Sequence, residues 1–385
     1  MAVKTGNVNP ANYPDEIFDL YSIPAFDSGK SELTVGNRIG SPKQVVQPGD
    51  VLLAKIVPHI RRCWIVGKNR GKRIIASGEW IVFRPAGDID ANYLRHVLVG
   101  DSFHAQFMNT VAGVGGSLMR ARPVFVAQIK IPVPPLAEQE RIAQVLDHVN
   151  ALRARRRQAI SLLDVLTQSI FVEMFGDPVR NPKGWPMKTI GDLIESASYG
   201  TSEKASEEGD IPVLRMGNIT SSGQIDLSDL KFMDRPTVSV KYLIRRGDVL
   251  FNRTNSADLV GKTAIYRGSD ELAYAGYLIR MRVNKENDPE YLAAFLNTPY
   301  AKRVLRGMCK SIVGMANINA RELQNINVAE PPLNLQVDYA KRVEVIESLR
   351  EIQRRHLVEL DTLFASLQNR AFRGDLWLDE AVPAA

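Results

Sequence analysis

The chain has few of the residues from which metal sites and disulfide frameworks are built. Among its 385 residues are two cysteines, Cys63 and Cys309, and five histidines. The cysteines lie far apart without metal-type spacing, and the histidines are scattered. We therefore predict free thiols in a reducing, cytoplasmic environment, and neither a metal nor another cofactor.

Long apolar runs are also missing. No uninterrupted run approaches the roughly 20 residues that a membrane span needs. The N-terminal residues Met1–Thr5 (MAVKT) have no apolar segment behind their charge, which disfavours a secretory signal and a membrane partner. With 45% hydrophobic and 24% charged residues, the composition is typical of a globular protein, and the length suits two or three domains.

The balance of charge is positive. The formal net charge is +6 at pH 7. Basic surface attracts phosphate, so a nucleic-acid partner is permitted. Many basic proteins bind no nucleic acid, and the charge alone does not establish such a partner.

The sequence is internally duplicated. Gly49–Leu52 (GDVL) recurs as Gly247–Leu250, and Pro134–Leu136 (PPL) recurs as Pro331–Leu333. The other matches at an offset of 197 or 198 are Gly78 with Gly276, Arg84 with Arg282, Asp90 with Asp288, Tyr93-Leu94 with Tyr291-Leu292, Gln139 with Gln336, and Gly176-Asp177 with Gly374-Asp375. A period near 200 residues is too long for a solenoid and indicates a duplicated module.

Each module is predicted to combine a β-rich part with a long helix. Short apolar runs such as Val51–Ile56, separated by glycine and proline, are typical of strands. The Pro-Pro pair cannot lie inside a helix and marks the junction. Apolar residues then recur at heptad spacing, which predicts helices from about Ala137 to about Phe175 and from about Leu335 to about Phe372.

The predicted fold class is α+β, with two globular β-rich domains in tandem repeat joined by two long helices. Because a whole module lies between them, these helices can run antiparallel and form a coiled coil about 55 Å long. Alternatively, each helix packs only on its own module. The predicted boundaries are 1–135 for the first β-rich domain, 136–177 for the central helix, 178–332 for the second domain, 333–375 for the C-terminal helix and 376–385 for a tail.

Side chains that could bind DNA occur in both modules. The segments after the two GDVL runs are favoured, because each follows a turn and an apolar strand, and because Arg suits guanine and Asn suits adenine. The predicted DNA-binding residues are Lys43, Lys55, Arg61, Arg62, Arg215, Asn218, Arg253, Asn255 and Lys262. Further basic side chains of the two modules are His59, Lys68, Arg70, Lys72, Arg73, Lys241, Arg245 and Arg246. Of these, Arg70–Arg73 could equally form an exposed turn, and Arg245-Arg246 could solvate a strand start. The run Arg153–Arg157 is either a solvated helix face or a contact for DNA or an acidic partner.

Three fragments resemble catalytic motifs but are incomplete. Gly261–Thr263 (GKT) has Ser256 where a phosphate loop requires glycine. Asn297–Tyr300 (NTPY) lacks the first proline of the adenine-methyltransferase tetrapeptide, and Asp229–Lys231 has no evident partner acid for a nuclease. We expect no catalytic centre in the chain. A fused nuclease or methyltransferase fragment and a coiled-coil protein without DNA are the alternative interpretations.

Several segments together resemble one protein family. Ile131–Ile142 (IPVPPLAEQERI) looks like the start of the central conserved helix of type I restriction–modification specificity subunits. Asn181–Trp185 (NPKGW) resembles the entry to their second target-recognition domain, and Ile211–Ile219 and the GDVL segments are similar to motifs of those domains. The resemblance covers nearly the whole chain. The second helix departs from it, because Asn334-Leu335-Gln336 lacks the usual Glu before Gln.

The resemblance implies a function in host defence without catalysis. Each globular half would be a target-recognition domain that reads one part of an asymmetric, split DNA sequence, and the helices would form the antiparallel coiled coil between them. The implied partners are double-stranded DNA, two modification subunits that methylate adenine, and restriction subunits that add ATP-driven translocation and cleavage.

Overall fold

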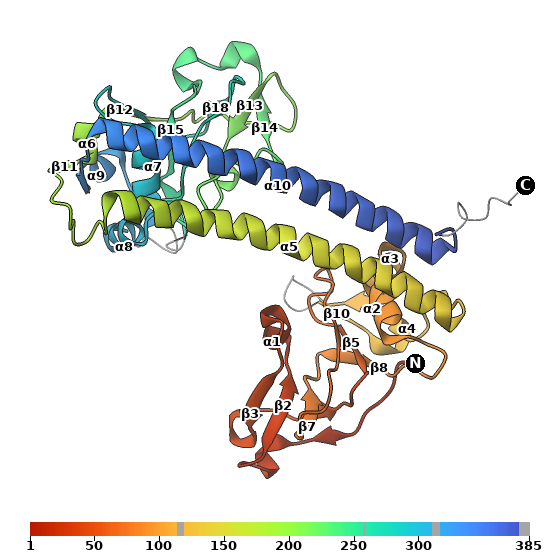
Figure 1. The fold of residues 1–385 in the computed structure, drawn as a ribbon. Helices are drawn as coiled ribbons and strands as arrows, with labels where there is room; N and C mark the ends of the chain where they lie inside the picture. Colours follow the sequence, from red (N-terminus) through yellow and green to blue (C-terminus); the bar gives the residue numbers. More distant parts are fainter. Residues whose placement is uncertain (114–118, 257–258, 310–315, 377–385) are drawn as a thin grey trace, which may run out of the picture. The chain divides into compact units, whose positions relative to one another are not determined.

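A computed structural model describes residues 1–113, 119–256, 259–309 and 316–376. Its mixed α/β structure contains two long helices, α5 (Leu136–Phe175) and α10 (Leu333–Arg373) (Figure 1). Both helices begin and end within two residues of the predicted positions. The chain divides into two compact units: unit 1 is Met1–Arg156 with His356–Ala385, and unit 2 is Arg157–Arg355.

Unit 1 is built on two larger β-sheets and one two-stranded sheet. Its strands are β1 (Asn7–Val8), β2 (Ile17–Tyr21), β3 (Glu32–Val35), β4 (Lys43–Val45), β5 (Val51–Ala54), β6 (Cys63–Ile65), β7 (Arg73–Ala76), β8 (Trp80–Phe83), β9 (Val111–Ala112) and β10 (Arg120–Ala121). Its shorter helices are α1 (Ile23–Ser28), α2 (Ala91–Val99), α3 (Asp101–Met108) and α4 (Pro123–Val126). One sheet has the order β1-β4-β7-β2-β3, with β2 and β7 parallel, and the other is the antiparallel sheet β6-β5-β8.

Strand β5 is buried on both faces, which explains why its sequence is continuously apolar rather than alternating. Val51 and Leu53 pack into a core shared with α2 and α3, whereas Leu52 and Ala54 pack with Trp80 on the opposite face. Since alternate side chains of a strand point to opposite sides, this one strand joins two cores. It thereby fixes the position of the residue that follows it, Lys55.

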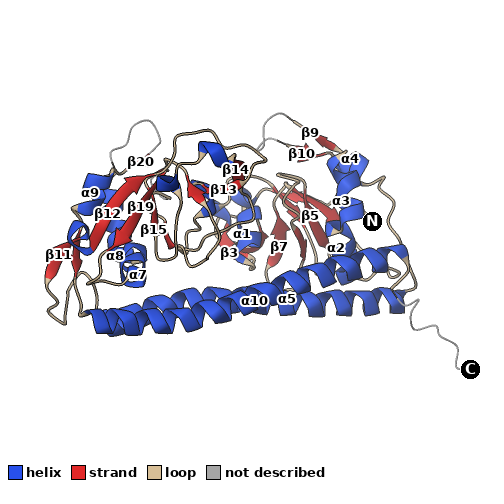
Figure 2. Cartoon of the chain, turned by 90° about the horizontal axis from the view of Figure 1, so that it is seen from above, coloured by secondary structure: helices blue, strands red, loops and turns tan. Residues whose placement is uncertain are grey.

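Unit 2 contains a similar antiparallel sheet. Its strands are β11 (Met187–Thr189), β12 (Ile194–Tyr199), β13 (Ile211–Leu214), β14 (Lys231–Met233), β15 (Val249–Asn252), β16 (Thr254–Asn255), β17 (Thr263–Ile265), β18 (Ala273–Tyr274), β19 (Leu278–Val283), β20 (Ala316–Asn317) and β21 (Asn327–Ala329). Its shorter helices are α6 (Ile190–Leu193), α7 (Pro289–Asn297), α8 (Pro299–Met308) and α9 (Ala320–Gln324). The main sheet has the order β12-β19-β15-β17, a second has the order β14-β13-β18, and α7 packs on the main sheet through the core that contains Phe251 and Ile279 (Figure 2).

Several residues that match in the sequence also make the same contacts. Asp50 and Asp248, each 1% exposed, immediately precede the central strands β5 and β15. Asp50 accepts hydrogen bonds from Arg84 at 2.8 Å, and Asp248 accepts them from Arg282 at 2.9 and 3.4 Å. A buried aspartate needs such a partner because an unpaired charge is costly to bury. The need for this ion pair explains why both the aspartate and the arginine occur at matching positions in the two modules.

Within each unit, part of α5 lies beside part of α10 (Figure 1). In unit 1, Arg153 of α5 pairs with Asp361 of α10 at 2.5 Å. In unit 2, Asp164 of α5 pairs at 2.8 Å with Arg350 of α10, whose side chain is 2% exposed and which also binds Glu347. Further along α5 in the same unit, the ring of Phe171 lies 5.8 Å from that of Tyr339, which is earlier in α10. The two segments of unit 2 therefore run antiparallel.

The helix α5 also exposes apolar side chains. Leu162, Val165 and Val172 are 59%, 58% and 49% exposed. By length and composition alone, an 18-residue window of this helix with mean hydropathy 1.2 could cross a membrane. The same helix carries the charged run Arg153–Arg157 and buries Phe171 against Tyr339 of α10, so its apolar side chains also serve packing within unit 2.

Candidate nucleic-acid interface

In unit 1, three segments of the chain meet where β5 ends. The amide of Ala54 donates to the carbonyl of Arg62 at 3.0 Å. The next residue, Lys55, donates its amide to the carbonyl of Glu79 at 2.9 Å and accepts from the amide of Ala121 at 2.8 Å. These bonds hold the backbone of Lys55 on both sides, so its side chain starts from a fixed point.

In unit 2, the end of β15 has the same arrangement. The amide of Asn252 donates to the carbonyl of Lys262 at 2.9 Å. Arg253 then donates its amide to Tyr277 at 3.1 Å and accepts from the amide of Ile318 at 2.9 Å. Lys55 and Arg253 therefore occupy equivalent positions, as do Arg62 and Lys262.

The predicted DNA-binding residues fall into two groups in each unit. The residues at the ends of the central strands are Lys55, Arg61 and Arg62 in unit 1, and Arg253, Asn255 and Lys262 in unit 2. Arg215 precedes the 3₁₀ turn Met216–Asn218, and Asn218 is its last residue. The Nζ of Lys262 contacts this turn by donating to the Met216 carbonyl at 3.0 Å. Lys43 lies on β4 of the other sheet of unit 1, where Ser41 binds its ammonium.

Aspartates within the same unit neutralise several of the predicted arginines. Arg61 pairs with Asp101 at 2.5 Å, and Arg215 pairs with Asp229 at 3.1 Å. Arg62 forms a bidentate pair with Asp27, at 2.8 and 3.0 Å, and its hydrogen bond lowers the pKa of that carboxyl. These arginines must exchange an acid for a phosphate to bind DNA, which reduces the gain from each contact.

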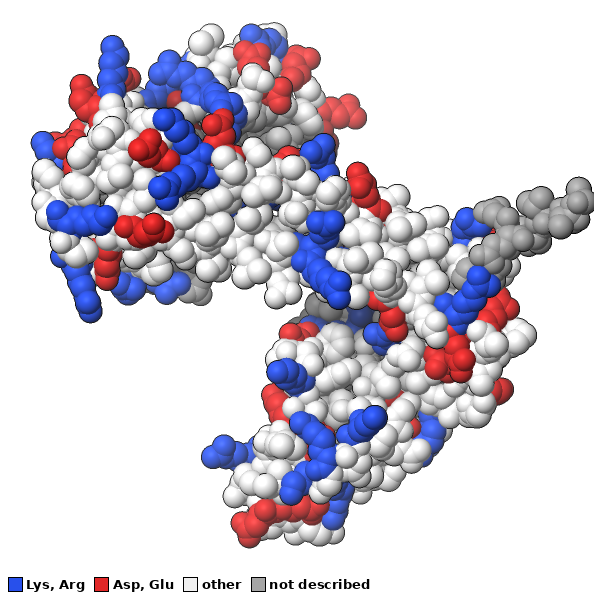
Figure 3. Space-filling model, viewed as in Figure 1, with Lys and Arg blue, Asp and Glu red and all other residues white. Residues whose placement is uncertain are grey.

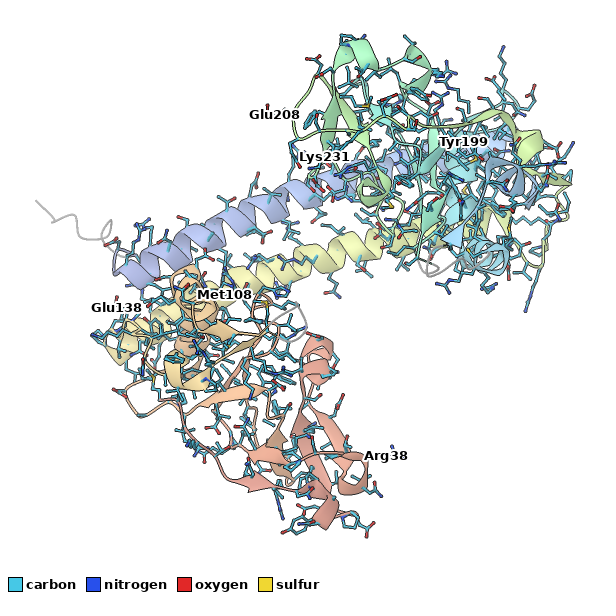
Figure 4. All side chains as sticks on the ribbon, turned by 180° about the vertical axis from the view of Figure 1, so that it is seen from behind. Arg38, Met108, Glu138, Tyr199, Glu208 and Lys231 are labelled. Atoms are coloured by element: carbon cyan, nitrogen blue, oxygen red, sulfur yellow. The ribbon has the colours of Figure 1, made fainter. Side chains whose placement is uncertain are left out.

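Arg253 differs from these arginines. Within the described part of the chain its side chain has no acidic partner, and its guanidinium lies 4.8 Å from the ring centre of Tyr199, a residue of β12 that Figure 4 labels. Its Nε is buried without a hydrogen-bond partner. Stacking on an aromatic ring holds a planar guanidinium in one orientation and leaves its outer N–H groups for a bidentate acceptor. Sequence reasoning missed Tyr199, which lies 54 positions earlier in the chain.

Asn218 has a supporting position. It is 3% exposed, its Oδ1 accepts from the amide of Arg215, and its Nδ2 donates to the carbonyls of Asp226 and Asp229. Both amide protons are used inside unit 2, so this side chain stabilises the turn and offers no donor to a base. The sequence shows the residue type but not its burial.

The backbone is strained beside Lys55. Val57 has a φ of 48°, which is rare for a β-branched residue. Such conformations persist where surrounding structure enforces them, and they gather at ligand sites. Nothing in the sequence around Val57 signals this conformation.

The incomplete catalytic motifs take part in local structure. Thr263 donates its hydroxyl to the Gly261 carbonyl, and Asn297 donates to the carbonyls of Thr263 and Ala293. Thr298 caps α8 by accepting from the amide of Ala301. Over the described ranges, no group of three or more His, Cys, Asp or Glu side chains could hold a metal ion.

Charge on the viewed face is mixed. Figure 3 shows Lys and Arg interspersed with Asp and Glu on both units. A net charge of +6 is therefore not concentrated into one continuous basic surface on this face. Local geometry at the strand ends is a better guide to DNA contacts than overall charge.

Comparison with known proteins shows which proteins this chain is similar to. The family model for the type I restriction modification DNA specificity domain matches residues 182–362. The chain is 25% identical to the type I restriction enzyme EcoKI specificity subunit of Escherichia coli K12, over 94% of this chain and 83% of the relative. It is 24% identical to the StySPI specificity subunit of Salmonella potsdam, with the same coverage.

Solved structures share the fold. A chain from a study of complex assembly and conformational transition of the type I R-M system has a TM-score of 0.55 at 21% identity and covers 97% of this chain and 96% of its own length. The S subunit of a type I system from M. genitalium has a TM-score of 0.53 at 11% identity, with 96% coverage of both chains. Residues 182–362 thus match the type I restriction modification DNA specificity domain. Over nearly its whole length the chain is similar to type I specificity subunits.

Proposed function

We propose that this chain selects the DNA sequence on which a type I restriction–modification complex acts. Residues 1–135 and 178–332 would be target-recognition domains that read the two unequal parts of a split target. The chain would have no catalytic role. It would position two adenine-methylating modification subunits, and restriction subunits, on double-stranded DNA.

One observation carries the proposal: the strand end that holds Lys55 in unit 1 recurs around Arg253 in unit 2. The backbone hydrogen bonds are equivalent, whereas the side chains differ. A duplicated frame with different side chains suits two similar readers of two different sequences. The curated relatives, which are named as specificity subunits, support the same function.

We further propose that α5 and α10 form one antiparallel coiled coil, the frame between the two domains. The antiparallel pair Asp164–Arg350 and the pair Arg153–Asp361 support this arrangement. In this proposal residues 136–177 and 333–375 form the frame. Of the predicted tail, 376–385, all but Leu376 lies outside the described residues.

The test is the assembled complex of this chain with its modification subunits. Methylated adenines are mapped on a random DNA library, and a two-part motif with an unread spacer is expected. Arg253→Ala should relax the bases read in one half only, since a bidentate contact contributes about 1–3 kcal/mol of discrimination.

Two results would contradict the proposal, and a third would exclude Arg253 from the interface. Duplex binding that is insensitive to salt would indicate a coiled-coil protein without a DNA role, because phosphate contacts release counterions. Methyl transfer by the purified chain alone would indicate a fused enzyme. Unchanged specificity in Arg253→Ala would remove that residue from the interface.

A further inference from the structure

We infer that three equivalent side chains at the end of each central strand determine which bases that unit prefers. The first recognition triad is Lys55, Glu79 and Arg120, and the second is Arg253, Tyr277 and Asn317. This inference rests on the proposed function and goes beyond it, because it assigns base selection to matched positions in the two units.

The backbone places the triads in equivalent positions. Lys55 is bonded to Glu79, as Arg253 is to Tyr277. The third position comes from another segment. Ile56 forms an antiparallel bridge with Arg120 in unit 1, and Thr254 of β16 pairs with Asn317 of β20 in unit 2. Three chain segments therefore converge in the same way in both units.

The first triad contains an ion pair. The Nε of Arg120 lies 3.1 Å from Oε2 of Glu79, and the two side chains are 41% and 31% exposed. Lys55, half-buried beside them, adds a second positive charge. Such a set offers a carboxylate that can accept from the cytosine amine and cations that can donate to guanine.

The second triad has different chemistry on the same backbone. Tyr277 is 52% exposed, and Asn317 is exposed with its Oδ1 accepting from the hydroxyl of Thr254 at 3.3 Å. Arg253 stacks on Tyr199. This set offers a guanidinium for guanine, an amide for adenine, and an aromatic face for the thymine methyl group.

The contrast with the start of the same strands indicates selection rather than packing. There the residues are identical in both units, with Asp50 and Asp248 buried against Arg84 and Arg282. At the other end of each strand, the three triad positions are exposed or half-buried and none is identical. Partly exposed ion pairs contribute little to stability, so Glu79 and Arg120 can be replaced without loss of the fold.

The experiment converts the first triad into the second. The variant Lys55→Arg, Glu79→Tyr, Arg120→Asn is assembled with its modification subunits, and bound duplexes are selected from a library randomised in both half-sites. We expect one or two positions of one half-site to change by roughly 5- to 150-fold, the equivalent of one bidentate contact. The new preference should match that of the second half-site, and the other half should stay unchanged.

A matched control is Glu32→Tyr with Arg38→Asn, which makes two of the same changes at exposed positions of unit 1 on β3 and the adjoining turn. Its base preferences should equal those of the parent. The reverse exchange in unit 2, Arg253→Lys with Tyr277→Glu and Asn317→Arg, tests the inference independently if the first variant does not fold.

The outcomes separate the two claims. A parent complex that selects no sequence would refute the proposed function itself. If the parent selects a two-part sequence and the folded triad variants keep its base preferences, the assignment of base selection to the triads is wrong, whereas the proposed function stands. A control that shifts the preferences as far as the triad variant does would also overturn them.

Discussion

Gln336 tests how each long helix is attached to its domain. Its side chain is completely buried in the first turns of α10. Its Nε2 donates to Oδ1 of Asn287 and to the Pro331 carbonyl, both at 2.8 Å, and its Oε1 accepts from the amide of Asp288 at 2.9 Å. Gln336→Leu keeps a similar volume but leaves all three groups without this partner.

The expected cost follows from these contacts. A buried polar group that loses its partner costs about 1–3 kcal/mol. Asp288 is only partly buried and can reach solvent, whereas Asn287 is 5% exposed and Pro331 is buried. For the three groups together we expect a loss of about 3–6 kcal/mol in the free energy of local unfolding.

Hydrogen exchange on the full chain measures this loss region by region. A loss of ~3 kcal/mol lowers amide protection about 150-fold, since each 1.4 kcal/mol is a factor of ten. We expect the decrease in α7 and in the start of α10. Gln139 makes the equivalent bonds in unit 1, to the amide of Asp90 and to the carbonyls of Asp88 and Pro134. Gln139→Leu should therefore lower amide protection in α2.

The control is Gln158→Leu, the same change at an exposed position of α5. It should leave the protection of α7 and α2 unaltered. Protection of α7 within a few-fold of the parent in Gln336→Leu would refute the reasoning. So would an equal decrease in both units.

Three further predictions concern specificity and pH. Exchanging residues 178–332 for the matching region of a relative should change one half of the mapped methylation target and leave the other intact; a change in both would show joint reading. Four residues inserted near Gln158 add ~6 Å of helix, so the mapped spacer should grow by one or two base pairs at ~3.4 Å each, and an active variant with the old spacer would exclude α5 as the ruler. Burial lowers the pKa of Lys302, which donates to the Gly261 carbonyl and to Asn297, from 10.5 to about 8. Between these values the unfolded chain binds more protons, so denaturation should show unit 2 gaining stability as the pH rises above 8, and Lys302→Met should lose this gain.

The sequence was sufficient for the features that depend on local pattern. Heptad spacing and the Pro-Pro pairs predicted both long helices to within two residues, because these signals lie inside the helices themselves. The recurrence of Gln139 as Gln336 was visible as identity. The structure adds the reason, since each glutamine joins its helix to the cap of α2 or α7.

Features that depend on distant partners were not predictable. Asp101 neutralises Arg61 from 40 positions away, and Asp27 neutralises Arg62 from 35. The match of Arg120 with Asn317 was hidden for another reason. Neither residue type is retained there, and the offset has changed from 198 to 197.

The buried Arg350 has a consequence for how the helix pair can vary. Sliding α10 along α5 by one turn, ~5.4 Å, would take this guanidinium away from Asp164. Glu347 of the same helix would stay paired with Arg350, so the cost is one lost charge-assisted hydrogen bond, about 1.5–3 kcal/mol. The 31% exposure of Asp164 places the cost at the lower end of this range. The segments of α5 and α10 in unit 2 therefore pair most stably in a few discrete registers. A longer or shorter frame restores this pair only where it brings an acid opposite position 350 again, and intermediate lengths are less stable.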